Sequence, residues 1–414
     1  MRDKADASRA PARRFRGAEW ASYGLIIGAV LLGWQIAIQP FIKRAPVEVA
    51  VRLSPDSPLV LRRAAEAELA AGRDANAASL GRSALSRSPF DVRALRVVGL
   101  TEAHAGRDAQ ADDILTLAGN WSLRDDPTHA WLIEHRLRQG DYTSGFAHAD
   151  TLVRRREDIQ PQVFRLFTVA GTEDRQRSLP VLARLLAASP PWRSDYFDSL
   201  NASPQGVQIA ASLAVMLQPG RTPLTNEELR PLYMKLLQMG QFEALRTVRD
   251  RLKRPPVSDL VTNGEFGAPS APEPFQWRLA QRAGAVAEIA PSENRDPALR
   301  IEYDGYNRAR IASQLLLLSP GRYRLTYAVR EESGDARAHF VWKVACLPGE
   351  RLIASSPAEP GTGTGWTSVS LPLTVPANCP AQWLRLEGTP GDKRSLTAAW
   401  FDRVSIVSAG EAGR

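Results

Sequence analysis

A regular spacing of similar short segments is the feature that most restricts how this chain folds. The glycines of three such segments, Gly72, Gly106 and Gly140, recur at equal intervals. Further matches at the same offset join Ser54-Pro55 with Ser88-Pro89, Ala77 with Ala111, and Ala84 with Ala118. An interval of about 34 residues is the period of a repeated helix pair, which must stack on its neighbours to bury its apolar face. The sequence therefore predicts an α-solenoid.

Residues 55–121 resemble the tetratricopeptide (TPR) family in their small residues, which are Ala65 and Gly99 on the first helix, Ala77, Ala84, Ala111 and Ala118 on the second, and Gly72, Gly106 and Gly140 at the turns. Helices that cross closely need small residues at the contact, and glycine permits the tight turn. The third unit keeps Gly140 but has Gly145 and Leu152 in place of the alanines, so its helix contacts should differ. The resemblance implies a helical domain at 50–255 that binds protein partners on a concave face. A spacer is the alternative.

The N-terminal segment predicts a membrane anchor. Six Lys or Arg residues lie within the first sixteen positions, and residues 23–42 then carry no charge. About twenty such residues suffice to cross a bilayer as a helix. The excess of basic residues before the run predicts a cytoplasmic tail at 1–22 and a bulk exported to the periplasm of a bacterial envelope, anchored in the inner membrane. A cleaved signal peptide is the alternative.

Charge and motifs exclude other classes of function. The net charge of +8 comes mainly from arginines scattered along the chain, so nucleic-acid binding is not expected. No H-E-x-x-H, G-x-S-x-G or P-loop pattern is present, and we expect no enzyme. Two distant carboxylates could still meet in the fold, so a degenerate carbohydrate-active enzyme remains an alternative.

The C-terminal part changes character after Pro255-Pro256. Short runs alternate apolar and polar residues as half-buried strands do. These runs are 298–303, 323–329, 339–344, 367–373, 382–386 and 398–407. They predict an antiparallel β-sandwich at 256–408, followed by a disordered tail at 409–414.

Four phrases of this part resemble the carbohydrate-binding-module and galactose-binding-like jelly-roll families, and they lie at 260–266, 275–277, 318–323 and 400–404. The resemblance implies that exposed aromatic rings could stack on sugars, and the available aromatics are Tyr306, Trp342, Trp366 and Trp383. Trp277 and Trp400 are assigned to packing. A sugar binder should gather the exposed rings on one surface, whereas a sandwich that contacts protein should bury or scatter them.

The same resemblance implies a structural calcium ion held by Glu265 and Asp402, because calcium prefers oxygen ligands. Gly267 stands where many relatives carry an acidic residue, which departs from the family pattern. No other cofactor is expected.

The two cysteines, Cys346 and Cys379, both lie in the predicted sandwich, each close to a predicted strand and a turn. A disulfide is the economical interpretation and suits an oxidising compartment. Two free buried thiols are the alternative.

Together these features predict a membrane-anchored, non-enzymatic scaffold or adaptor. It would bind protein through its helices and glycan through its sandwich, in the export or assembly of a surface polysaccharide. A purely structural protein-contact module is the competing hypothesis.

Overall fold

The computed structural model describes residues 28–30, 33–34, 40, 42–282, 284–293, 295–333, 339–357, 365–390 and 396–409. The chain forms two compact units, Met1–Leu152 and Val153–Arg414. The described part is helical up to Leu252 and consists of β-strands from Arg278 onward, which confirms the predicted order of a helical region followed by an antiparallel sandwich.

Most of the predicted anchor at 23–42, the predicted tail at 1–22 and nearly all of the tail at 409–414 lie outside the described residues. Within the ranges that are described, no helix has both the length and the apolar character needed to cross a bilayer.

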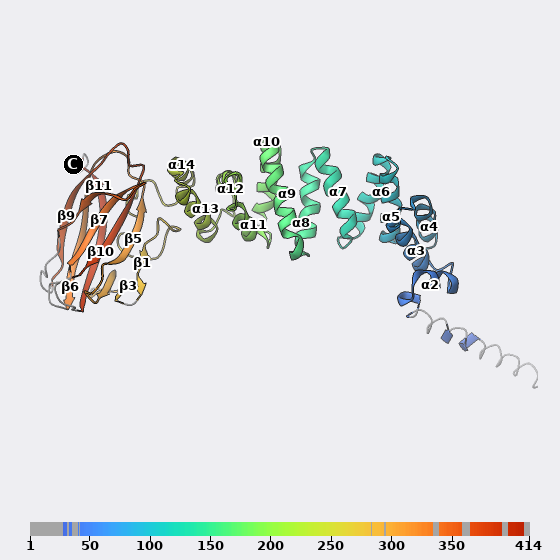
Figure 1. Ribbon diagram of the computed structural model, residues 1–414, viewed down its shortest axis with the longest axis horizontal. Helices are drawn as coiled ribbons and strands as arrows, with labels where there is room; N and C mark the ends of the chain where they lie inside the picture. The colour runs from blue at the N-terminus through green and yellow to red at the C-terminus, as the bar shows by residue number, and fades with distance from the viewer. Residues whose placement is uncertain are drawn as a thin grey trace, which may run out of the picture. The chain divides into compact units, whose positions relative to one another are not determined.

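The first unit is built from α-helices in sequence (Figure 1). They are α2 (Val47–Leu53), α3 (Pro58–Ala70), α4 (Asp74–Arg87), α5 (Val92–His104), α6 (Asp108–Trp121), α7 (Asp126–Arg138) and α8 (Tyr142–Val153). The starts of α3, α5 and α7 recur at the same interval as the three glycines, and so do those of α4, α6 and α8. The helices therefore follow the spacing of the sequence segments. Membership of the TPR family stays a prediction.

The turns between paired helices have a common geometry. Gly72, Gly106 and Gly140 have φ values of 72°, 73° and 70°. This left-handed conformation is accessible to glycine at little cost. It ends the helix and lets an N–H group beyond the last turn donate to a carbonyl of that turn. At the first turn, the Arg73 N–H donates to the Glu68 carbonyl at 2.9 Å. The repeated glycine thus marks a helix end for a local, steric reason.

The small residues of the repeat lie in the contacts between helices. Ala65, Ala77, Ala84, Ala111 and Ala118 are fully buried. Ala65 and Ala77 pack with Val97 in one apolar cluster, and Ala111 packs with Leu115 and Leu132 in the next.

The second unit begins with helices and ends with the sandwich. Its helices are η1 (Glu157–Ile159), α9 (Gln160–Glu173), α10 (Arg175–Ala187), α11 (Arg193–Leu200), α12 (Pro204–Leu217), α13 (Asn226–Gln238) and α14 (Phe242–Leu252). A capping box starts α13, where Thr225 and Glu228 satisfy each other's backbone N–H groups.

The sandwich consists of two antiparallel sheets (Figure 1). Its strands are β1 (Arg278–Leu279), β2 (Gln281–Arg282), β3 (Ala285–Pro291), β4 (Pro297–Tyr303), β5 (Ala309–Leu316), β6 (Gly321–Ser333), β7 (His339–Leu347), β8 (Arg351–Ser355), β9 (Thr367–Val375), β10 (Ala381–Thr389) and β11 (Thr397–Ser408). One sheet has the order β1-β5-β10-β7-β8, and the other has the order β2-β3-β4-β11-β6-β9.

An aromatic cluster fills the space between the sheets. Trp277 and Trp342 meet edge to face at 5.8 Å between ring centroids, and the rings of Tyr327 and Phe401 lie 5.7 and 6.0 Å from that of Trp342. The indole N–H of Trp277 donates to the Asn263 carbonyl at 2.9 Å, which satisfies its polar atom inside the core. The packing role predicted for Trp277 agrees with this position.

A disulfide joins Cys346 of β7 to Cys379, which precedes β10. This confirms the predicted pair.

Candidate functional site

The four aromatics proposed for sugar stacking do not lie on one surface. Trp342 has an exposed fraction of 0% and belongs to the core. The prediction that its ring faces a ligand is therefore wrong. The alternation of β7 predicts which residues share a face with Trp342, but the opposing sheet decides that this face points inward.

Trp366 lies beside the other sheet from Trp383. It directly precedes β9 of the six-stranded sheet and is partly buried. The Arg330 guanidinium lies 5.6 Å from its ring centre and 5.4 Å from that of Trp400, so a cation is held between two indoles. Trp400 also donates its indole N–H to Glu332. This cluster packs the outer side of that sheet, and Arg330 also forms an ion pair with Glu293.

Tyr306 and Trp383 border the outer face of the five-stranded sheet. Tyr306 is 65% exposed in the turn between β4 and β5. Trp383 lies on β10 and is partly buried. The Arg385 guanidinium lies 5.7 Å from its ring centre. Tyr306 and Trp383 thus remain candidates for stacking on a sugar ring.

Alternation along β10 gives this outer face its chemistry. Leu384 and Leu386 point into the core. Trp383, Arg385 and Glu387 therefore point to the opposite side. In the register with β5, Arg385 pairs with Ser313 and Glu387 pairs with Arg310. A row of charged side chains results.

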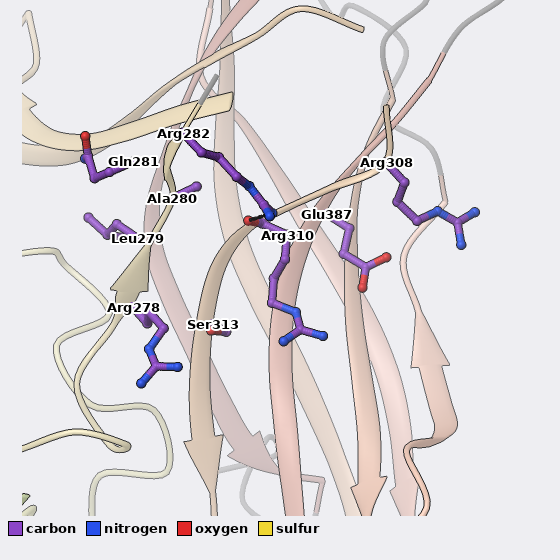
Figure 2. Close-up of a pocket in the computed structure, with 9 residues that line it drawn as sticks. All are labelled: Arg278, Leu279, Ala280, Gln281, Arg282, Arg308, Arg310, Ser313 and Glu387. Carbon is purple, nitrogen blue, oxygen red and sulfur yellow. Dashed lines mark hydrogen bonds between the residues drawn. The ribbon is translucent and has the colours of Figure 1, made fainter. Parts of the chain in front are cut away.

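A hollow of about 510 Å³ lies on this face (Figure 2). Its volume is within the range of roughly 300–1,000 Å³ that is common for small-ligand sites. We call it the arginine hollow, and its lining residues are Arg278, Leu279, Ala280, Gln281, Arg282, Arg308, Arg310, Ser313 and Glu387. Four guanidinium groups and one carboxylate give it an excess of positive charge.

The hollow forms where the chain crosses from one sheet to the other. Ala280 separates β1 of the five-stranded sheet from β2 of the six-stranded sheet. Its N–H donates to the Ile311 carbonyl at 2.8 Å, and its carbonyl accepts from the Ala287 N–H at 2.9 Å. Backbone hydrogen bonds to β5 and to β3 therefore fix the position of Ala280, and with it the lining residues on either side of the crossing.

Several charged groups around the hollow are already engaged. Arg278 donates to Glu273 at 2.9 Å, and Arg282 donates to the Arg310 carbonyl at 3.0 Å (Figure 2). Lys343 forms an ion pair with Glu387 at 2.7 Å.

Arg385 makes two parallel hydrogen bonds to Glu350, at 2.9 and 2.6 Å. The Arg385 side chain holds the pKa of Glu350 below its usual range, chiefly through these hydrogen bonds. Glu350 and Glu387, which both lie near Arg310, are therefore committed to other cations.

Arg308 and Arg310 differ from their neighbours. Among the described residues, neither side chain has a hydrogen bond or an ion pair to a protein group, and both are exposed. Burial lowers the pKa of Arg310, and the adjacent Arg385 and Arg282 lower it further, while Glu350 and Glu387 oppose this. The Arg310 guanidinium group is thus held close to like charges, and neither it nor Arg308 has a partner among the described protein groups.

A smaller hollow of about 180 Å³ continues from the first. It shares Arg282 and Arg308 with the arginine hollow and is also lined by Asp304 and Asn307. The Tyr306 N–H donates to Asp304 at 3.1 Å, so the exposed tyrosine lies on the turn that carries Arg308. An aromatic ring and free guanidinium groups therefore occur on one short stretch.

The predicted calcium ligands lie near each other. Burial raises the pKa of Asp402, and the neighbouring charges of Glu265 and Asp296 raise it further, while Arg403 opposes this. Asp402 also contacts Arg403 at 3.8 Å. In the described part of the chain, no group of three or more His, Cys, Asp or Glu residues is placed to hold a metal ion. The calcium site stays a prediction.

Most of the hollow is not predicted by the sequence pattern. Arg310 lies on β5, and residues 309–316 are not among the runs that predict strands. The alternation of Trp383, Arg385 and Glu387 was a usable signal for a polar strand face. A local sequence pattern does not predict that Arg278 and Arg282 line the hollow. Their position there depends on the crossing between the two sheets, on either side of which they lie.

No family model matches the chain, and no curated protein matches it. Solved structures that are similar include one described as "CBM4 structure and function", with 17% identity, coverage of 36% of this chain and 99% of that chain, and a TM-score of 0.29. Another is TmCBM61 in complex with beta-1,4-galactotriose, with 15% identity, coverage of 36% and 98%, and a TM-score of 0.26. A third is the CBM22-1 xylan-binding domain from Paenibacillus barcinonensis, with 16% identity, coverage of 32% and 85%, and a TM-score of 0.25. These matches lie over the C-terminal region. Such low identities and TM-scores say nothing about which ligand this chain binds.

Proposed function

We propose that this protein is a non-enzymatic adaptor that binds glycan through the outer face of its five-stranded sheet. The observation that carries the proposal is the arginine hollow, with its unpaired donors Arg308 and Arg310, and the exposed Tyr306 on the turn that carries Arg308. Sugar sites combine an aromatic or apolar surface with a few fixed polar groups that bond the hydroxyls. Tyr306 and Trp383 would supply stacking surface, and the arginines would supply donors.

The rest of the proposed role follows from the sequence. The helices would hold a protein partner, and the N-terminal segment would anchor the chain in a bacterial inner membrane with its bulk in the periplasm. A protein that joins these functions would serve the export or assembly of a surface polysaccharide.

The test is binding of the purified full chain to an array of neutral and acidic glycans. The variants Tyr306→Ala and Trp383→Ala should each weaken binding about tenfold, because a lost stacking partner removes about 1 kcal/mol or more. Trp366→Ala is the matched control, since Trp366 is also partly buried beneath an arginine but lies beside the other sheet.

If no glycan binds, the proposal is overturned and a protein-contact role for the sandwich replaces it. If Trp366→Ala weakens binding and Trp383→Ala does not, the glycan binds at the six-stranded sheet and the proposed site is overturned. Equal thermal unfolding curves for the variants would show that any loss is a loss of contact rather than of fold.

A further inference from the structure

We infer that the glycan held at the arginine hollow is acidic, and that Arg308 and Arg310 recognise the carboxylates of its uronic acid residues. This inference rests on the proposed glycan binding and goes further by naming the class of sugar. A neutral polysaccharide needs no concentration of guanidinium groups, whereas a polymer of uronic acids offers one carboxylate per acidic unit.

The first step is the charge balance of the hollow. Its single lining carboxylate, Glu387, is paired with Lys343 at 2.7 Å. The nearby Glu350 is paired with Arg385. Among the described residues, the carboxylates near Arg310 are therefore already paired with other cations. A bound anion could pair with Arg310 without displacing a protein carboxylate from it.

The second step is geometry. A guanidinium group presents planar, parallel N–H donors that match the two oxygens of a carboxylate, and such bidentate pairs are among the strong hydrogen bonds. Arg310 of β5 pairs with Glu387 of β10, directly beyond a register shift in that pairing, and the Arg282 side chain donates to the Arg310 carbonyl at 3.0 Å. The backbone beneath Arg310 is therefore fixed by contacts from both sheets, which reduces the ordering needed when a ligand binds.

The third step is the placement of Arg308 and Arg310 along the two hollows. Arg308 lines both hollows, and Arg310 lines the larger one (Figure 2). The two hollows share Arg282 and Arg308, so together they form one surface lined by four arginines and by the carboxylates of Glu387 and Asp304, with Tyr306 on the same turn. A chain of sugars can place a ring against the tyrosine while its acid groups reach the arginines.

The experiment measures binding of the full chain to polygalacturonate and to the same polymer after its carboxyl groups are reduced to alcohols. The two polymers differ in the acid group and otherwise share a sugar backbone. We expect tight binding to the acidic polymer and at least tenfold weaker binding to the reduced one. Raising the NaCl concentration from about 50 to about 300 mM should weaken the acidic interaction, because exposed charges are screened.

The decisive variants separate recognition from bulk charge. Arg310→Ala and Arg308→Ala should each weaken polygalacturonate binding about tenfold to hundredfold. Arg310→Lys keeps the charge but loses the planar fork, so it should also bind several-fold more weakly. Arg322→Ala is the matched control, because Arg322 is an exposed arginine of β6 on the other sheet. It should bind within twofold of the parent chain.

Each other result has a defined meaning. Equal binding of the acidic and reduced polymers, with no effect of Arg310→Ala, would overturn the acidic specificity and leave glycan binding standing. No binding to either polymer or to any array glycan would overturn both. Equally tight binding of dextran sulfate and DNA, with Arg310→Lys unimpaired, would show a general attraction for polyanions and would also overturn the inference.

Discussion

Gly99 shows how a single residue sets the distance between two helices. A Cβ atom added there would lie 2.6 Å from Leu115 Cγ and 2.7 Å from Leu115 Cδ2. Leu115 is fully buried in α6, so its side chain cannot swing into solvent. The close approach of α5 and α6 therefore requires glycine at this position.

We predict that Gly99→Ala destabilises the first unit by about 1–3 kcal/mol, because overpacking outweighs the better helix propensity of alanine. Hydrogen exchange of the α5 and α6 amides in the full chain measures the change. Ser79→Ala, at an exposed position of α4, is the control and should alter protection by less than about 0.5 kcal/mol. Unchanged protection in Gly99→Ala would contradict the steric explanation.

His148 lies against His129, and protonation of His148 is unfavourable in the fold. Their Nδ1 atoms are 3.1 Å apart. Burial lowers the pKa of His148 to about 4, and the nearby His129 and Arg136 lower it further, while Asp112 and Asp141 oppose this. An unfolded histidine titrates near 6.5, so the unfolded chain binds more protons between these values. Stability is therefore fully present above pH 6.5 and is lost as the pH falls towards 4.

We predict that the first unit loses roughly 1–2 kcal/mol of stability between pH 7 and pH 4.5 on account of His148, after allowance for its partial exposure. Urea unfolding at the two pH values measures the loss. In His148→Gln the free energy of unfolding should change less between the two pH values. In His104→Gln, at an exposed histidine of α5, it should change as much as in the parent chain. An equal slope in His148→Gln and the parent chain would rule out this assignment.

At the scale of the element, alternate residues of strand β10 serve the core and the outer face of the sheet. Its residues Leu384 and Leu386 fill the core, while Arg385 and Glu387 point to the opposite side. The disulfide fixes the start of this strand, because Cys379 closely precedes it and Cys346 lies on the adjacent β7. Core and site residues thus share one strand, whose pairing with β5 shifts by one residue between Leu386 and Glu387.

We predict that the double variant Cys346→Ala/Cys379→Ala lowers the stability of the sandwich by about 3–4 kcal/mol, because the cross-link constrains the unfolded chain. The two cysteines have a sequence separation of 33, and closing a loop of that length has this order of magnitude. Hydrogen exchange of β7 and β10 measures the effect. Dithiothreitol should lower the stability of the parent chain by a similar amount and that of the double variant by none.

At the scale of the whole molecule, the second unit contains both helices and strands as one compact body. Arg246 of α14 donates to the Leu317 carbonyl at 2.7 Å and to the Pro380 carbonyl at 3.0 Å, which ties the last helix to the sandwich. Tyr233 of α13 meets Phe275 edge to face at 5.2 Å. The helices next to the sandwich therefore support it directly, beyond being joined to it along the chain.

We predict that Arg246→Ala loosens this junction by about 1–3 kcal/mol, because two hydrogen bonds from a charged donor are lost. Limited proteolysis within residues 253–277 should become about tenfold faster, with each fragment still folded. Arg251→Ala changes an exposed arginine of the same helix and should leave the cleavage rate unchanged. Equal cleavage of Arg246→Ala and the parent chain would show that other contacts carry the junction.

The sequence by itself determined the features that depend on local geometry. The glycines at Gly72, Gly106 and Gly140 end helices because a left-handed turn is a property of a few adjacent residues. The alternation of most strands and the two cysteines also predicted the sandwich and its cross-link, as the pairing of Cys346 with Cys379 confirms.

Only the tertiary structure decided which faces are buried and which side chains meet. Trp342 and Trp383 both lie on alternating strands, yet the opposing sheet covers the first and leaves the second partly open. The arginine hollow needs β5, β10 and the crossing at Ala280 to come together from positions far apart along the chain. Pairing over such separations is set by the packing of the whole sandwich, because a local pattern specifies which residues share a face but not what that face meets.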